Sequence, residues 1–334
     1  MLEFAKEVAL HKWFLTCLLL IGISSSALAQ VERRILQEHF SRTDIHSIID
    51  NSIVALQQEY LHQNKVKKAI FALQQFRDKP KFNKGYDATV FLLELEKLLI
   101  NSTGDRSLAL LPITSGSLLS KDENFNGFTS NNNITTQRLQ GNIGLLSLAG
   151  DFANESAIQA VDKALAELHN VSALVIDLRD TGTTNIDIAN SLLSHFVKPN
   201  THLSSVTKHS PANSFELYSI RKTAVLEGAR DIPVFVLHSA FVEGVWEWFS
   251  FTLQGLGRAN IVGEDTMGIA QMYKFIPVGA NQQLKLTYAT LGHPVTKQNW
   301  QEKGVQANDY ARSEEAIALA VELANEAIFK FKVE

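Results

Sequence analysis

The stretch of this sequence best suited to chemistry runs from residue 233 to residue 271. Its pattern predicts a buried strand at 233–238, a tight connection and a helix at about 244–253. A strand that turns sharply into a helix is where many hydrolases place a nucleophile and the amides that stabilise an oxyanion. Here the turn carries Glu243, Gly244 and Val245, and it contains no serine, cysteine or threonine. The turn therefore has the frame of a nucleophile site without the nucleophile.

Two residues beside this turn are alternative catalytic candidates. His238 ends the predicted strand, and Ser239 follows it. A histidine at the end of a buried strand is more often a hydrogen-bonded core residue than a general base. An active hydrolase that uses Ser239 and His238 as a displaced nucleophile and base stays open as an alternative.

Cofactor motifs are weak throughout the chain. The run V-G-E-D-T-M-G at 262–268 lacks the glycine spacing and the lysine of a phosphate loop. The ten histidines show no metal-ligand spacing, and the lone cysteine, Cys17, cannot support them. Aromatic residues crowd the predicted helix at 246–251, which favours core packing over an apolar ligand pocket. We expect no metal and no cofactor.

Length and charge indicate an ordinary globular protein. The chain has 334 residues, enough for one large domain or two modest ones, and 45% of them are hydrophobic. Its formal net charge is −4, with acids and bases well mixed. This balance gives no electrostatic footprint for a nucleic-acid partner or for a membrane surface.

The first 29 residues have the pattern of a secretory signal. Lys6 and Lys12 precede an apolar run at 13–23, and A-L-A at 27–29 forms a cleavage site. A membrane anchor is the alternative, but the apolar run is short for a membrane span. We expect a secreted or periplasmic protein with no membrane span after signal cleavage.

The rest of the sequence divides into a helical part and a mixed part. Three amphipathic helical patterns between about 43 and 100 predict a small N-terminal helical domain at 30–112. The run N-G-F-T-S-N-N-N-I-T-T lacks periodicity and places a linker at 113–140. From 141 to 334, apolar strands alternate with amphipathic helices, which predicts a sheet covered by helices. Residues 273–288 predict a β-hairpin around G-A-N at 279–281.

Several motifs together resemble the tail-specific, or C-terminal processing, serine protease family. They are V-I-D-L-R at 175–179, L-G-R-A at 256–259, I-V-G-E at 261–264, N-W at 299–300 and G-V at 304–305. The nearest branch is the one that includes the modules of interphotoreceptor retinoid-binding protein. The resemblance implies an α/β fold with a crotonase- or ClpP-like core of β-β-α units. It also implies an N-terminal helical bundle, and the linker is too short to hold a PDZ domain.

The resemblance also assigns positions to catalytic roles. It places the family nucleophile at Gly244 and the family base, a lysine, at Ile269. The family's acidic residue is matched by Glu247, and its oxyanion loop is reduced to Gly182. We expect the former active-site cleft to be bordered by Glu247, Asp177, Gly182, Gly268, Gln271 and Tyr273.

The chemistry of these positions determines the functional hypothesis. Glycine has no attacking atom and isoleucine cannot accept a proton, whereas acyl transfer needs both a nucleophile and a base. The sequence therefore predicts a catalytically degenerate, protease-like protein. We expect it to bind a polypeptide segment or an apolar small molecule in the cleft.

Overall fold

The structure is a computed structural model that describes residues 39–113, 132–152, 154, 156–220 and 228–333. The chain forms two compact units. Among the described residues, the first contains 39–55, 67–112 and 277–284. The second contains 56–66 and the described residues within 113–276 and 285–333. The proposed signal segment at 1–29 and the first part of the predicted linker, 114–131, lie outside the described residues.

The first unit contains the predicted small helical bundle. Its elements are β1 (His39–Phe40), most of α2 (Arg42–Glu59), most of α3 (Gln63–Arg77), η1 (Pro80–Phe82), β2 (Tyr86–Asp87), α4 (Ala88–Thr103) and β3 (Ala109–Pro112), whereas residues 56–66 belong to the second unit. Phe91 of α4 is fully buried and packs against the rings of Phe40, Phe76 and Phe82. Asp87 caps the start of α4 by accepting a hydrogen bond from the Val90 amide at 2.9 Å. The apolar residues that recur at helical spacing in the sequence therefore face this aromatic core.

A six-stranded sheet forms the core of the second unit. Its order is β13-β10-β9-β6-β5-β4, and all neighbours are parallel except the β4–β5 pair. The strands are β4 (Asn132–Leu139), β5 (Ile143–Phe152), β6 (Ala173–Thr184), β9 (Val234–His238), β10 (Asn260–Gly263) and β13 (Asp309–Tyr310). Because the central strands are buried on both faces, they read as continuous apolar runs.

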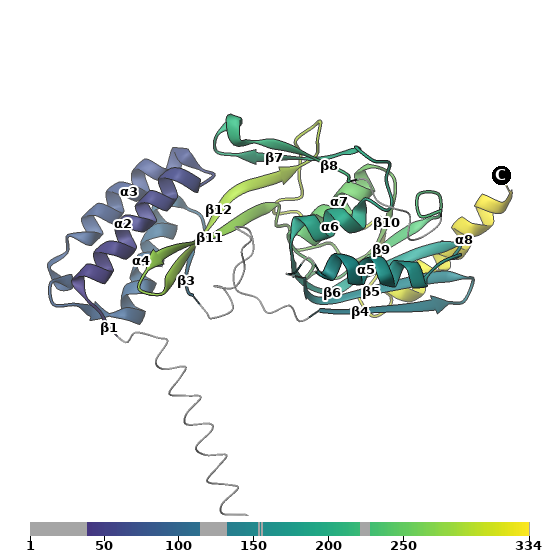
Figure 1. Ribbon diagram of the computed structural model, residues 1–334, viewed down its shortest axis with the longest axis horizontal. Helices are drawn as coiled ribbons and strands as arrows, with labels where there is room; N and C mark the ends of the chain where they lie inside the picture. Colours follow the sequence, from purple (N-terminus) through teal and green to yellow (C-terminus); the bar gives the residue numbers. More distant parts are fainter. Residues whose placement is uncertain (1–38, 114–131, 153, 155, 221–227, 334) are drawn as a thin grey trace, which may run out of the picture. The chain divides into compact units, whose positions relative to one another are not determined.

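Helices supply the apolar surfaces that cover this sheet (Figure 1). They are α5 (Ser156–Glu167), α6 (Ile186–Leu193), α7 (Val245–Gly255) and α8 (Ala316–Val333). Alternate residues such as Val175 and Leu237 share one buried cluster with Ala316, Ala320 and Ala324 of α8. The carboxyl ends of β6 and β9 lead to α6 and α7. Because the two strands are parallel neighbours, both strand-to-helix turns lie at the same end of the sheet.

A second sheet contains the predicted hairpin. Its main path is β11-β12-β7-β8, and β3 also pairs with β12. The strands are β7 (His202–Lys208), β8 (Phe215–Tyr218), β11 (Gln271–Gly279) and β12 (Gln282–Gly292). Ala280 and Asn281 make the turn with φ angles of 48° and 55°, the left-handed conformation of a two-residue type I′ hairpin.

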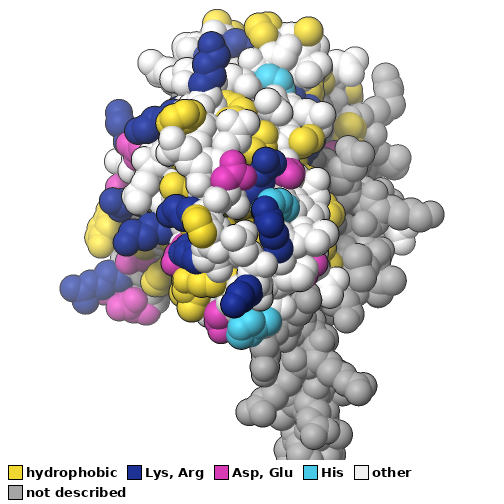
Figure 2. All heavy atoms as spheres, turned by 90° about the vertical axis from the view of Figure 1, so that its left-hand side faces the viewer, with side chains coloured by type: hydrophobic (Ala, Val, Ile, Leu, Met, Phe, Trp, Pro, Cys, Tyr) yellow, Lys and Arg dark blue, Asp and Glu magenta, His cyan; other side chains and the backbone are white. Residues whose placement is uncertain are grey.

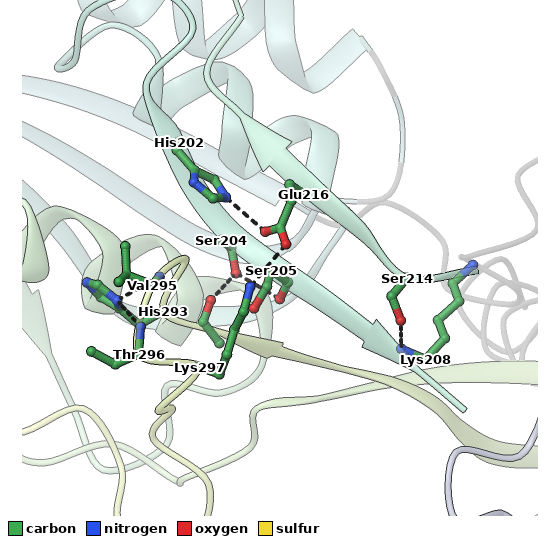
Figure 3. Close-up of polar contacts among 11 residues, drawn as sticks. His202, Ser204, Ser205, Lys208, Ser214, Glu216, His293, Val295, Thr296 and Lys297 are labelled. Atoms are coloured by element: carbon green, nitrogen blue, oxygen red, sulfur yellow. Dashed lines mark hydrogen bonds and ion pairs between the residues drawn. The ribbon is translucent and has the colours of Figure 1, made fainter. Parts of the chain in front are cut away.

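An ion-pair cluster joins β7 and β8 to the segment after β12 (Figure 3). Glu216 accepts hydrogen bonds from His202 at 2.8 Å and from Lys297 at 3.0 Å. Burial raises the pKa of Glu216, but these two partners outweigh burial and leave the pKa below its ordinary value. All three side chains are partly exposed. We therefore interpret the cluster as a structural contact that contributes little to the free energy of unfolding.

Two boundaries differ from the sequence prediction. The linker predicted at 113–140 ends earlier, because Asn132–Leu139 forms the edge strand β4 along β5. The loop expected around Gly182 is also wrong, because β6 continues through this residue to Thr184. In both places polar residues such as threonine and asparagine occupy a strand that is stabilised by its neighbour's backbone rather than by apolar side chains.

The described surface agrees with the mixed composition. Figure 2 shows lysine and arginine side chains spread over one face of the molecule and interrupted by acidic and hydrophobic ones. Among the described residues, none of the helices combines the length and the apolar character that a membrane crossing requires.

Candidate functional site

The turn between β9 and α7 has the backbone shape of a nucleophile elbow. Gly244 lies immediately before α7 with φ 61° and ψ −118°, a conformation that glycine adopts far more easily than other residues. A Cβ atom built on Gly244 would meet no heavy atom within 4 Å. The position therefore has room for a side chain, although the sequence supplies none.

A buried carboxylate holds this elbow in place. Glu247, in the first turn of α7, is fully buried. Its Oε2 accepts hydrogen bonds from the amides of Gly244 and Ile269, each at 2.8 Å. Its Oε1 accepts from the Gly268 amide at 2.6 Å and from the Thr266 hydroxyl. One carboxylate thus connects the turn at Gly244 to the turn at Gly268 and Ile269.

This arrangement compensates for the burial of Glu247. Three backbone amides and one hydroxyl replace the water that the carboxylate loses. The N-terminus of α7 adds a favourable dipole because Glu247 lies in its first turn. Thr266 Oγ1 also accepts a hydrogen bond from the Val305 amide at 2.7 Å, which fastens the closing segment of the chain to the same cluster.

A cavity of about 290 Å³ opens beside the elbow, entirely within the second unit. Its walls come from the end of β6, the start of α6, the elbow, β11 and β12. The lining residues are Thr183, Thr184, Asn185, Ile186, Glu243, Gly244, Val245, Ile269, Gln271, Met272, Tyr273, Phe275, Lys285, Tyr288 and Leu291. Apolar and aromatic side chains predominate, with a few polar groups among them, as in typical small-ligand sites.

Two charged side chains line this cavity. Lys285 of β12 places its ammonium 4.2 Å from the centre of the Tyr273 ring. Burial raises the pKa of Glu243, Lys285 opposes that shift, and the negative charges of Glu247 and Asp151 add to it. Burial also raises the pKa of Tyr288 to about 12, so its phenol stays neutral at physiological pH.

The site residues predicted from the sequence fall into three groups. The two predicted catalytic positions, Gly244 and Ile269, and the cleft residues Gln271 and Tyr273 all line the cavity. Glu247 and Gly268 lie behind the lining and are joined to each other by a hydrogen bond.

Asp177 and Gly182 lie outside the cavity lining. Asp177 forms a two-pronged ion pair with Arg179 at 2.7 and 2.8 Å. Gly182 lies against Asp151, whose Oδ1 accepts hydrogen bonds from the Thr183 amide and hydroxyl. Both predicted cleft residues therefore have structural partners in the region around β6.

The alternative catalytic candidates, Ser239 and His238, do not form a hydrogen-bonded pair. His238 Nε2 lies 2.7 Å from Ser250 Oγ, and both residues are fully buried. Ser239 instead donates its hydroxyl hydrogen to the Arg179 carbonyl at 2.7 Å. None of these three residues lines the cavity. Burial lowers the pKa of His238 to about 3, so the ring is neutral at physiological pH.

The aromatic residues of α7 fill the core. Trp246, Trp248 and Phe249 are fully buried, and Trp246 packs edge-on against Phe152. None of these residues lines the cavity, so the core-packing interpretation of this helix is confirmed. Among the described residues, no group of three or more histidine, cysteine, aspartate or glutamate side chains could hold a metal ion.

Sequence reasoning missed Lys285 and the cavity-facing role of Glu243. Lys285 falls between Leu284 and Leu286 in an otherwise apolar strand pattern, and such an isolated charge could have marked it. The hairpin pairing of β11 with β12 was predicted, but the strand pattern alone does not show that Lys285 reaches the Tyr273 ring or lines a cavity.

The chain is similar to known proteins in sequence and in fold. Residues 142–310, just over half of the 334-residue chain, match the sequence model of peptidase family S41. The photosystem II D1 C-terminal processing protease has a similar structure, with a TM-score of 0.61 at 13% identity over 81% of this chain and 94% of that chain. A lipoprotein from Streptococcus agalactiae gives a TM-score of 0.60 at 12% identity over 85% of this chain and 96% of that chain. These structural likenesses show a shared fold, and the predicted protease-like α/β fold is confirmed.

We predict that Glu247→Gln destabilises the second unit by roughly 2–5 kcal/mol, because an amide nitrogen would face backbone donors and leave them unsatisfied. Urea unfolding monitored by tryptophan fluorescence measures the change. Glu322→Gln, on α8, is the matched control and should cost less than about 0.5 kcal/mol. Equal unfolding free energies for the two variants would contradict the role given to Glu247.

We also predict that His238 makes the protein less stable in acid. The unfolded histidine binds a proton below pH about 6.5, whereas the folded one stays neutral down to pH about 3. Between these values the unfolded state binds more protons, so the free energy of unfolding falls as pH falls, by at most about 1.4 kcal/mol per pH unit from this group. Urea titrations at several pH values should show a shallower pH dependence for His238→Asn, and identical slopes would contradict the assignment.

Proposed function

This chain belongs to peptidase family S41, and from that premise we propose that it is a non-catalytic member that binds a ligand in the cavity beside Gly244. The ligand is a polypeptide segment or an apolar small molecule. The observation that carries the proposal is the elbow itself, where the backbone keeps a conformation that would strain most other residues and no attacking side chain is present.

The missing chemistry supports a binding role. Covalent acyl transfer needs a nucleophile and a base within hydrogen-bond distance of each other. Gly244 and Ile269 occupy the two positions that the family resemblance assigns to these roles, and both line the cavity. Their backbone amides are held by one carboxylate oxygen, but neither side chain can attack a carbonyl carbon or accept a proton.

The cavity supports the same proposal through the groups that line it. Its volume of about 290 Å³ and its aromatic and aliphatic walls suit the burial of an apolar group. Burial of such a group contributes roughly 25 cal/mol for each Å² of apolar surface removed from water. The fold therefore offers a driving force for binding that does not depend on catalysis.

The alternative of a displaced nucleophile has weaker geometric support. A hydrolase that used Ser239 would need its hydroxyl beside a general base and facing the cavity. Ser239 donates to the Arg179 carbonyl, while the His238 ring is engaged with Ser250 inside the core. Activating either serine would require the elbow region to rearrange.

We further propose that the protein acts outside the cytoplasm, in the periplasm or after secretion. The basic residues, apolar run and A-L-A site at 1–29 support this proposal. Removal of that segment would also remove Cys17, the only cysteine of the chain. The mature protein would then depend on no thiol, which suits an oxidising compartment.

Incubation of the purified exported protein with an unfolded, fluorescently labelled polypeptide tests the proposal. We expect no cleavage above a buffer blank, and a rise in fluorescence anisotropy if a polypeptide is the ligand. Native mass spectrometry of the same sample should reveal any co-purified small molecule. The intact mass should correspond to a chain that starts at Gln30.

Cleavage that persists through repurification would contradict the non-catalytic proposal. Ser239→Ala and Ser250→Ala identify the source of such cleavage, because loss in either variant assigns the displaced nucleophile. Cleavage that survives in both variants would indicate a contaminating protease or a different nucleophile. A folded protein that binds neither polypeptide nor small molecule would refute the binding role.

A further inference from the structure

Lys285 introduces a positive charge into a largely apolar cavity. The side chain extends from β12 across the ring of Tyr273 on β11, with its ammonium 4.2 Å from the ring centre. Both residues line the cavity, and Lys285 is only partly exposed. The ring face stabilises the cation but cannot accept a directed hydrogen bond in the way that an oxygen can.

Lys285 forms no ion pair with any residue that the structure describes. Among these residues, no carboxylate oxygen lies within 4.0 Å of the Lys285 ammonium. Two other lysines of the second unit reach an aromatic ring: Lys274 also pairs with Glu59 at 2.8 Å, whereas Lys208 has no carboxylate within 4.0 Å among the described residues and, unlike Lys285, does not line the cavity. The ammonium at this cavity wall therefore has a ring face and solvent as its surroundings, and it is available to a carboxylate that enters the cavity.

Glu243 is the nearby acid that could compete for this role. It lines the same cavity, and its charge interacts with Lys285 without forming an ion pair. The surrounding negative charges of Glu247 and Asp151, together with burial, favour its neutral form. Glu243 is therefore not a direct ion-pair partner of Lys285, and protonation of its carboxyl group as the pH falls increases the net positive charge of the cavity.

On these grounds we infer that the cavity binds a ligand that carries a carboxylate on an apolar body, and that Lys285 is the residue that recognises the carboxylate. This inference rests on the proposed binding function and narrows its ligand. The carboxylate has two possible sources, a small organic acid or the free C-terminus of a polypeptide. The aromatic and aliphatic walls contact the apolar body in either case.

Calorimetric titration with matched probes tests the inference. Phenylbutyrate and its neutral amide share one apolar body and differ in charge. Acetylated valyl-phenylalanine with a free or an amidated C-terminus makes the same comparison for a peptide. We expect at least one acid to bind about tenfold more tightly than its amide, the effect of one charge-assisted hydrogen bond.

Substitutions then assign that preference to a residue. Lys285→Met keeps the length of the side chain and should reduce the affinity for the acid to that for the amide. Lys303→Met changes an exposed lysine outside the cavity and should preserve the tenfold preference. Circular dichroism of the Lys285 variant separates a local loss of charge from a loss of the fold.

The pH dependence provides a readout that a purely structural lysine would not give. As pH falls through the raised pKa of Glu243, affinity for the acid should increase, until the ligand's own carboxylate is protonated near pH about 4. The variant Glu243→Gln should bind the acid more tightly than the native chain at neutral pH and should lose this increase.

The possible outcomes separate this inference from the proposed function. Preference for phenylbutyrate alone identifies small acids as the source, and preference for the free peptide identifies a C-terminus. Equal binding of acid and amide would overturn the role of Lys285 while leaving a binding cavity. Failure of all four probes, together with no binding of the unfolded polypeptide, would overturn both.

Discussion

The buried carboxylate of Glu247 is the interaction on which the site depends. It accepts four hydrogen bonds, from the elbow at Gly244, from the turn at Gly268 and Ile269, and from Thr266. These donors lie far apart in the sequence. Gly244 immediately precedes α7, whereas Thr266, Gly268 and Ile269 belong to the segment just before β11. Because a buried charge is costly without partners, the carboxylate fixes all of these segments at once. The shape of the elbow is therefore maintained by interactions that need neither a nucleophile nor a base.

This independence means that the turn can keep its shape whatever side chains stand at positions 244 and 269. The backbone of Gly244 keeps a conformation that most residues adopt only under strain, and the space beside it is open. The cavity that remains is bounded by apolar side chains, with Lys285 and Glu243 as its charged groups. Under the proposed function, these walls bury an apolar body and the charged groups select the polar group that this body carries.

Much of this arrangement could be predicted from sequence. The apolar run at 233–238, the glycine after it and the acid at 247 specify a strand, a turn and a helix, and β9 and α7 follow that pattern closely. The hairpin was predictable because A-N at 280–281 supports a left-handed turn. The extension of β6 through Gly182 and the edge strand β4 were missed, because neighbouring backbone stabilises them. Lys285 was missed because the strand pattern alone does not show that this lysine reaches the Tyr273 ring or borders a cavity.

Restoring the missing atoms tests the central claim most directly. A chain with Gly244→Ser and Ile269→Lys together, treated with a fluorophosphonate probe, should become covalently labelled at position 244, as intact mass and peptide mapping would show. The native chain and the single variant Ile269→Lys should remain unlabelled. If the double variant folds with an unchanged unfolding midpoint and still resists the probe, the elbow does not retain a hydrolase frame, and Gly244 does not mark the place of a lost nucleophile.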